Sequence, residues 1–87
     1  MFEIRYSVHA KQRLEVIEQS DPKSARIIFD HIQKLPLTYR QDPFLSGSLY
    51  EGLRRNRTGK YRIIYRASEK EKQIFVVTID FRKSAYD

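Results

Sequence analysis

Cationic residues suited to binding phosphate are concentrated in one short stretch of the chain. Between Gly52 and Ser68 there is no acidic residue, and that interval holds six cations: Arg54, Arg55, Arg57, Lys60, Arg62 and Arg66. Guanidinium groups are planar, permanently charged and able to grip a phosphate through two parallel hydrogen bonds. The cluster therefore predicts an anion site, and a polyanion is the partner that segregated charge favours. A solvated charged face and an acidic protein partner are the alternatives that these residues leave open.

The net charge of +6 is carried entirely by the C-terminal part of the chain. Residues 1–53 hold seven Lys/Arg and seven Asp/Glu, whereas residues 54–87 hold ten Lys/Arg and four Asp/Glu. There is no cysteine and there are two histidines. A disulfide framework, a thiolate zinc site and a cysteine nucleophile are therefore not expected. The sequence suggests no metal and no cofactor.

The length of 87 residues predicts a single domain over residues 1–87. No run approaches the roughly 18 apolar residues that a membrane span needs, and the N-terminal residues lack a signal-peptide pattern. We therefore expect a cytoplasmic protein without a membrane partner.

Two helices are predicted in the N-terminal half, after a short strand over residues 2–6. Ser7 is suited to cap the first helix, and apolar residues follow it at helical spacing. Asp21-Pro22 is a second helix start, because Asp accepts from free backbone N–H groups and Pro fits the first helical position. Pro36 is expected to end this helix. The short link between the two predicts an antiparallel helical hairpin.

The C-terminal half changes to a period of two. Residues 36–48 read as a surface connection, and strands are predicted over residues 49–57, 60–67 and 73–80. The predicted fold class is α+β with the order β-α-α-β-β-β, in which the N-terminal helical hairpin packs on one face of an antiparallel sheet.

Alternation along the strands predicts where the arginines point. If Tyr61, Ile63 and Tyr65 pack beneath the helices, Arg62 and Arg66 lie on the opposite face. Two arginines of the preceding strand share one parity and can join them, Arg55 and Arg57. Such crowding of like charges disfavours the free protein, so it is better explained by an anion site than by a scaffold. Asp80 is expected to pair with a nearby arginine, and Tyr61, Tyr65, Tyr6, Phe29 and Phe75 are expected in the core.

The stretch LRRNRTGKYRIIYR over residues 53–66, followed by FVVTIDFRKSAYD, resembles the RelE/ParE toxin superfamily. The helical hairpin, the central Arg-x-Arg-x-Gly-x-Tyr-Arg run and a closing Arg-x-x-x-Tyr match that family in order, over essentially the whole chain. The resemblance implies a RelE-like fold and a toxin of a type II toxin–antitoxin system. RelE members cleave messenger RNA in the ribosomal A site, and ParE members inhibit DNA gyrase.

The resemblance also implies site residues. Arg62 matches the strand arginine placed at the scissile phosphate, and Arg55 matches a Lys or Arg that lines the same site. Arg82 and Tyr86 match the C-terminal pair that completes the catalytic set. The remaining cations are expected to bind RNA: Arg54, Arg57, Lys60, Arg66 and Lys83.

Two departures from the family pattern bear on the chemistry. Phe81 stands where relatives often have His, so no imidazole adjoins Arg82, and Asn56 stands at a strand position that is usually apolar. His9 and His31 are expected to be structural or surface residues. The general base is therefore unidentified, and cleavage is expected to depend on the ribosome orienting the substrate.

The implied partners are a cognate RelB-like antitoxin, acidic and partly disordered when free, and a ribosome with its messenger and ribosomal RNA. Two other functions stay open. One is ParE-like inhibition of gyrase, against which the basic and aromatic C-terminal cluster argues. The other is a catalytically degenerate relative that binds RNA or an antitoxin.

Overall fold

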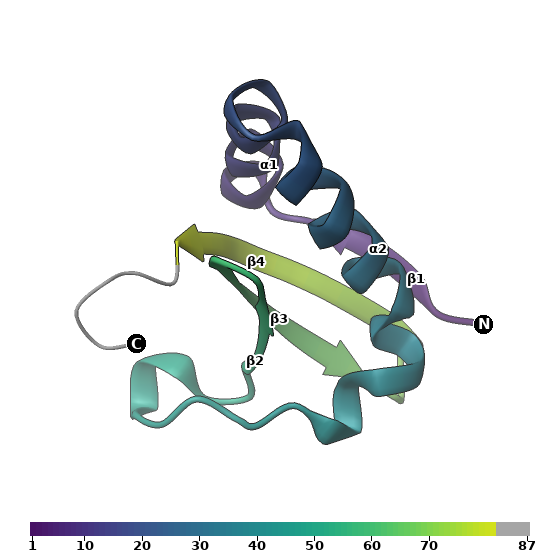
Figure 1. Cartoon of the computed structure of the whole chain (residues 1–87). Coiled ribbons are helices and arrows are strands. Elements are labelled where there is room, and N and C mark those ends of the chain that lie inside the picture. The colour runs from purple at the N-terminus through teal and green to yellow at the C-terminus, as the bar shows by residue number, and fades with distance from the viewer. Residues whose placement is uncertain (82–87) are drawn as a thin grey trace.

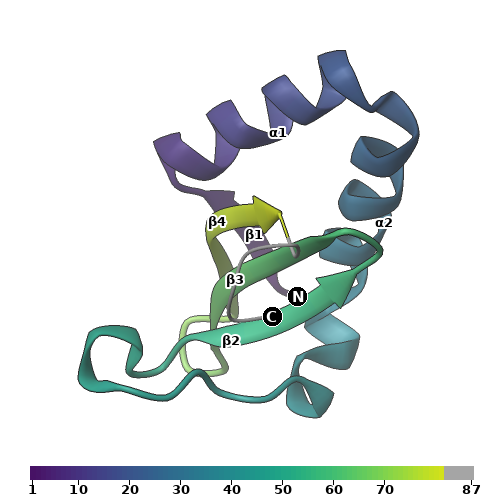
Figure 2. The same cartoon turned by 60° about the vertical axis from the view of Figure 1, so that its left-hand side comes forward.

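The structure is a computed structural model that describes residues 1–81. Two helices lie on one side of a four-stranded sheet (Figures 1 and 2), which confirms the α+β class and the predicted helical hairpin. The elements are β1 (Glu3–Tyr6), α1 (Val8–Ser20), α2 (Pro22–Thr38), β2 (Arg54–Thr58), β3 (Tyr61–Ser68) and β4 (Gln73–Phe81), with short 3-10 turns at η1 (Tyr39–Gln41) and η2 (Ser48–Tyr50).

Side-chain caps begin both helices, as the sequence predicts. The Ala10 N–H donates to Ser7 Oγ at 2.9 Å, and the Ser7 hydroxyl donates to the Val77 carbonyl at 2.6 Å, which ties the start of α1 to β4. Asp21 lies between the helices and accepts from the Ser24 N–H at 3.3 Å. Hydrogen bonding from Ser24, first from its side chain and then from its backbone N–H, lowers the pKa of Asp21.

Helix α2 continues past Pro36 to Thr38, so the prediction that it ends at Pro36 was wrong. Proline removes one backbone donor, but the last turn persists because Leu35 is buried and its carbonyl accepts from the Tyr39 N–H. Tyr39 is itself buried against the core. Tertiary packing therefore outweighs the local preference of proline.

The sheet has the order β1-β4-β3-β2 and is mixed. Strand β4 is antiparallel to β3, and β3 is antiparallel to β2, as expected for strands joined by turns. Strand β1 is parallel to β4, with Glu3 opposite Gln73, which departs from the all-antiparallel prediction. No turn joins these two strands, so local geometry does not fix their relative direction.

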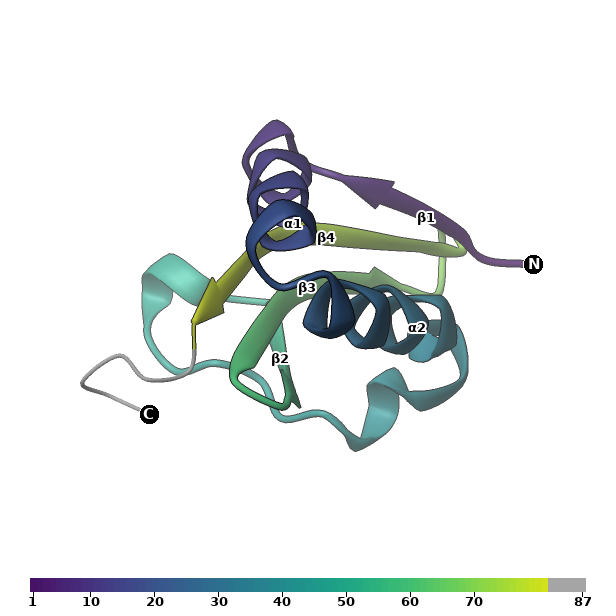
Figure 3. The same cartoon turned by 45° about the horizontal axis from the view of Figure 1, so that its top comes forward.

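The two helices lie over one face of the sheet (Figure 3). Buried side chains of the helices and of the strands form the core between them. Tyr61, Ile63 and Tyr65 are buried there, as the alternation predicts. Phe29 is 47% exposed on α2, so the expectation that it belongs to the core was wrong. No helix among the described residues is long and apolar enough to cross a membrane.

Residues 42–53, called here the arm, run along the side of the sheet away from the helices (Figure 1). The predicted strand over residues 49–57 is shorter than expected, because η2 occupies Ser48–Tyr50 and β2 begins at Arg54. Gly47 and Gly52 have φ of 98° and 81°, values that side chains rarely adopt, so the chain bends at both points. The arm is therefore a folded loop and not an extension of β2.

Candidate nucleic-acid interface

The strand register brings four arginines to the sheet face opposite the helices. Arg57 pairs directly with Arg62 across β2 and β3, and Arg55 pairs with Ile64, so these side chains share one face. Arg66 has the parity of Arg62 on β3. Arg57 and Arg66 are exposed, whereas Arg55 is half-buried. The predicted convergence of Arg55, Arg57, Arg62 and Arg66 on one face is thus present.

Arg62 lies deepest of the four, with a side chain that is only 13% exposed. Its Nη2 is 3.8 Å from Oδ2 of Asp80, the residue opposite it on β4. The Asp80 carboxylate also accepts from the Thr78 hydroxyl at 3.1 Å. The expectation that Asp80 pairs with a nearby arginine is confirmed. At this distance the pair is loose, so a phosphate can compete with Asp80 for the guanidinium.

A hollow of about 460 Å³ lies between the arm and the sheet. Arg62, Ile64, Thr78 and Asp80 contribute to it from the strands. The remaining lining residues are Leu45, Ser46, Tyr50 and Leu53 from the arm and Val77 from β4. The arginine face is therefore not a flat open sheet, because the arm covers part of it and gives Arg62 a partly enclosed surrounding.

Asp42 anchors the arm to the sheet through its carboxylate. The Tyr65 hydroxyl donates to Oδ2 at 2.5 Å, and the Asn56 amide donates to Oδ1 and Oδ2 at 3.2 and 3.0 Å. Burial of Tyr65, reinforced by this bond, raises the pKa of its phenol. The Arg54 guanidinium adds a bond to the Asp42 carbonyl at 2.8 Å. The first residue of the arm is thus held by three side chains.

Asn56 continues this network to helix α2. Thr58 donates its hydroxyl to Asn56 Oδ1 at 2.9 Å, and His31 Nδ1 lies 3.1 Å from Thr58 Oγ1 and 3.3 Å from Asn56 Oδ1. These contacts are all satisfied when Nδ1 of His31 carries the proton. It then donates to the Thr58 hydroxyl, and that hydroxyl donates to Asn56 Oδ1. The polar residue at this usually apolar strand position is therefore hydrogen-bonded on both sides. His31 has the structural place expected of it, and His9 is exposed on α1.

Two of the predicted RNA-binding cations lie away from the arginine face. Arg54 has the opposite parity on β2, and its guanidinium lies 3.9 Å from the Phe44 ring centroid and 5.5 Å from that of Tyr39. Lys60, in the turn before β3, has Nζ 3.9 Å from Asp21 Oδ2. The structure thus places Arg54 as a support of the arm and Lys60 beside the helical hairpin.

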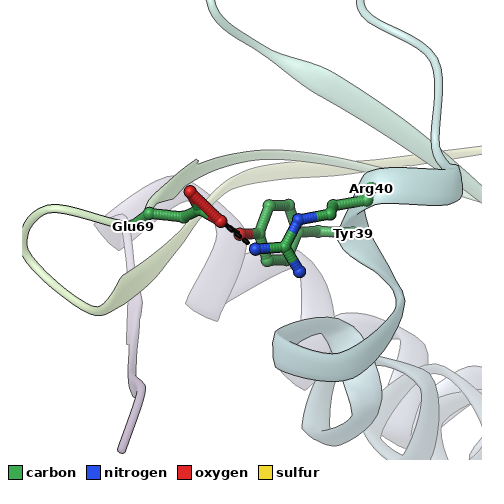
Figure 4. Close-up of polar contacts among 3 residues, drawn as sticks. All are labelled: Tyr39, Arg40 and Glu69. Carbon is green, nitrogen blue, oxygen red and sulfur yellow. Dashed lines mark hydrogen bonds and ion pairs between the residues drawn. The ribbon is translucent and has the colours of Figure 1, made fainter.

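A second polar cluster fixes the end of α2 to the turn between β3 and β4 (Figure 4). The Tyr39 hydroxyl donates to Glu69 Oε2 at 2.6 Å, and the Arg40 guanidinium pairs with the same oxygen. The hydrogen bond from Tyr39, followed by the charge of Arg40, lowers the pKa of Glu69. Arg40 also lies 4.8 Å from the centroid of the Tyr39 ring. The cluster anchors η1, from which the arm departs.

The C-terminal candidates Arg82, Lys83 and Tyr86 lie outside the described residues. Within residues 1–81, no group of three or more His, Asp or Glu side chains could hold a metal ion. The described part of the site therefore offers guanidinium groups for charge stabilisation and hydroxyl and carboxylate groups around Arg62. Guanidinium groups are suited to hold a phosphate, but arginine is too basic to act as a proton acceptor.

The arm contributes residues that sequence reasoning did not assign to the site. Tyr50 lines the hollow and is 50% exposed, and Asp42 holds the arm in place. The run from Pro36 to Gly47 indicated only a loop, because the contacts that shape it join residues far apart in sequence. One signal was available in the sequence: an asparagine, Asn56, within a basic strand that is otherwise rich in arginine.

A family model described as the ParE toxin of type II toxin–antitoxin systems matches residues 4–86. Among solved structures, the RelBE2 toxin–antitoxin complex of Mycobacterium tuberculosis is similar with 21% identity, a TM-score of 0.72, and coverage of 93% of this chain and 98% of that one. The archaeal RelE–RelB complex of Pyrococcus horikoshii OT3 has 25% identity, a TM-score of 0.69, and coverage of 97% and 98%.

The YoeB–YefM heterotetramer of Staphylococcus aureus is also similar, with 16% identity, a TM-score of 0.74, and coverage of 93% of this chain and 97% of that one. No curated protein sequence gives a significant match.

Proposed function

The chain belongs to the RelE/ParE superfamily, within the ParE toxin family of type II toxin–antitoxin toxins, and from this premise we propose that it is a ribosome-dependent endoribonuclease. The substrate is messenger RNA in the ribosomal A site. The observation that carries the proposal is the convergence of Arg55, Arg57 and Arg62 on one sheet face, with Arg62 lining a hollow. A phosphodiester backbone is the polyanion that fits such a face.

The proposed reaction is attack by the 2′-oxygen on its own 3′-phosphate. A bond forms from the 2′-oxygen to phosphorus, the bond to the 5′-oxygen breaks, and the products are a 2′,3′-cyclic phosphate and a 5′-hydroxyl. The 2′-proton leaves, and the departing 5′-oxygen gains a proton. Arg62 stabilises the extra negative charge on the phosphoryl oxygens, because a guanidinium can donate to two of them at once. No metal and no cofactor enters this reaction.

Other residues have proposed supporting roles. Arg55 and Arg57 hold the flanking backbone, and Arg66 extends the basic face. By family resemblance, Arg82 shares the charge stabilisation and Tyr86 stacks on a base or takes part in proton transfer. The ribosome orients the substrate, and positioning alone can lower a barrier by several kcal/mol.

Cleavage mapping of a messenger in a purified translation system tests the proposal. Wild-type protein is expected to cut at A-site codons when ribosomes are present, and Arg62→Ala is expected to abolish the cuts. Lys70→Ala removes the same charge from the exposed β3–β4 turn and is expected to cut normally. Absence of cuts by folded wild-type protein would contradict the proposal, as would full activity of Arg62→Ala.

Inhibition of DNA gyrase is a second candidate function, because the matching family model is that of the ParE toxin. A supercoiling assay with purified gyrase separates the two. Loss of supercoiling at toxin concentrations that leave messenger intact would favour the gyrase target. A protein that binds RNA without cutting it and leaves gyrase active would be a catalytically degenerate member.

The proposed protein partner is a RelB-like antitoxin, since the similar structures include complexes of RelE with RelB and of YoeB with YefM. Phe29 on α2 and Leu14 on α1 line a hollow of about 590 Å³ beside β1, which offers apolar surface to a segment that folds on binding. Co-expression with the product of the adjacent gene is expected to give a stable complex without toxicity. A toxin that stays monomeric beside that product would contradict this partner.

A further inference from the structure

We propose that the hollow beneath the arm binds one unstacked base of single-stranded RNA, with Tyr50 as the residue that stacks on it. This inference rests on the proposed nuclease function and names the part of the substrate that the arm reads. It concerns binding, so it can be tested apart from cleavage.

The lining of the hollow has the chemistry of a base site. Apolar side chains approach from the arm and the sheet, among them Leu53 and Ile64, which are both buried. Hydroxyl and carboxylate groups stand beside them on Ser46, Thr78 and Asp80. A base has apolar faces and an edge of hydrogen-bond donors and acceptors, so it requires this mixture. The volume of about 460 Å³ lies within the range of roughly 300–1,000 Å³ for small-molecule sites.

Tyr50 is placed to stack on such a base. Its side chain lines the hollow and remains 50% exposed, whereas the adjacent Leu49 is 90% exposed and does not line it. The Tyr50 ring lies close to Gly47: a Cβ added to this glycine would be 3.8 Å from Cδ2 of Tyr50. An accessible aromatic ring held at one side by backbone is a stacking surface that tolerates any base.

Cations flank the hollow where phosphates adjacent to the bound base would pass. Arg62 lines it from β3, and Arg57 is directly opposite Arg62 on β2. On the arm side, the Arg66 side chain approaches Gly52: a Cβ added to this glycine would lie 3.7 Å from Arg66 Nε. The surrounding arginines and the apolar lining therefore fit a nucleotide of a single strand. They do not fit a duplex, because its bases are stacked and unavailable.

Backbone hydrogen bonds within the arm hold this geometry. The Tyr50 N–H donates to the Gly47 carbonyl at 3.1 Å, and the Leu53 N–H donates to the Tyr50 carbonyl at 3.0 Å. The Leu45 N–H donates to the Leu53 carbonyl at 2.9 Å, which closes the arm on itself. Together with the Asp42 anchor, these bonds constrain the backbone of Tyr50, and a constrained backbone reduces the entropic cost of binding.

The test measures dissociation constants for fluorescently labelled single-stranded RNA of roughly eight nucleotides, a length within the usual site size. The bases are removed one position at a time. For the wild type, loss of the base that occupies the hollow is expected to weaken binding about 5- to 100-fold. Tyr50→Ala is expected to weaken binding of intact RNA by a similar factor and to become insensitive to that base. Tyr50→Phe keeps the ring and is expected to bind like the wild type.

Leu49→Ala is the matched control, because it removes an exposed apolar side chain from the neighbouring arm position outside the hollow. An equal effect of base removal in wild type and Tyr50→Ala would overturn the inference, as would equal affinities of Tyr50→Ala and Leu49→Ala. If alanine variants of Arg57 and Arg62 weaken RNA binding but Tyr50→Ala does not, the base-site inference fails and the proposed nuclease function stands. If the wild type binds no RNA on or off the ribosome, the proposed nuclease function fails with it.

Discussion

Replacing Asp42 with alanine should destabilise the protein far more than loss of a half-buried loop carboxylate normally does. Asp42 accepts hydrogen bonds from Tyr65 and Asn56, and Tyr65 is completely buried. The variant leaves the Tyr65 hydroxyl without an acceptor in the protein interior. An unsatisfied buried donor costs about 1–3 kcal/mol, and the lost bond from the Asn56 amide costs about 1 kcal/mol.

The sum is about 3 kcal/mol, which is a large share of the roughly 5–15 kcal/mol by which small domains are stable. A double-mutant cycle isolates the contact. In Asp42→Ala combined with Tyr65→Phe the stranded hydroxyl is absent. The double variant should therefore lose about 1–2 kcal/mol less than the sum of the single variants.

Urea denaturation followed by circular dichroism measures both quantities. With a slope of about 1 kcal/mol per molar, typical of a small domain, Asp42→Ala should lower the midpoint by about 3 M. Asp30→Ala, which removes an exposed carboxylate from α2, should change stability by less than about 0.5 kcal/mol. A midpoint for Asp42→Ala equal to that of Asp30→Ala, or strict additivity in the cycle, would refute the anchoring role.

Four further outcomes follow from the described contacts. Arg54→Ala should lower stability by about 1–2 kcal/mol, through loss of its bond to Asp42 and its contact with Phe44. Arg57→Ala should change the free energy of unfolding by less than about 0.5 kcal/mol, which urea denaturation measures. The same variant should reduce the slope of the logarithm of RNA affinity against the logarithm of salt concentration by about one, which a salt titration measures. The pKa of Glu69 is lowered in the folded state, so its ionised carboxylate stabilises the fold. That stabilisation is fully present above the unfolded pKa of about 4.3 and is lost as pH falls through the folded pKa. Glu69→Gln should therefore show a shallower loss of stability on acidification in urea midpoints from neutral to acid pH. The pKa of Tyr65 is raised mainly by burial, so stability should fall above about pH 10, where the unfolded chain ionises, and Tyr65→Phe should lessen that fall in alkaline denaturation.

Local signals predicted the helices and the arginine face well. Ser7 and Asp21 cap as expected, because a cap needs only a side chain and a nearby backbone donor. The face shared by Arg57 and Arg62 follows from strand alternation and a tight turn, which together fix the register. Such features depend on a few consecutive residues, so a single sequence contains them.

Features that depend on distant contacts could not be predicted. The direction of β1 is set by its pairing with β4, and the last turn of α2 is retained by burial of Leu35 and Tyr39. The arm owes its course to Asp42, whose partner Tyr65 is 23 positions away. The hollow was missed for the same reason, since alternation alone describes a sheet face as open and says nothing of a loop that returns across it.

The position of β4 in the middle of the sheet bears on how the protein is made. β4 supplies the partner of β1, seventy positions after it, and also carries Asp80 beside Arg62. Chains emerge N-terminus first at about 5–20 residues per second, so the helical hairpin can form seconds before β1 has a strand to pair with. During that interval the apolar faces of the hairpin and β3 have no cover from β4. A ribosome synthesising this chain therefore carries the helical hairpin and the four arginines of the β2–β3 face before it has made β4, which places Asp80 beside Arg62 and pairs with β1.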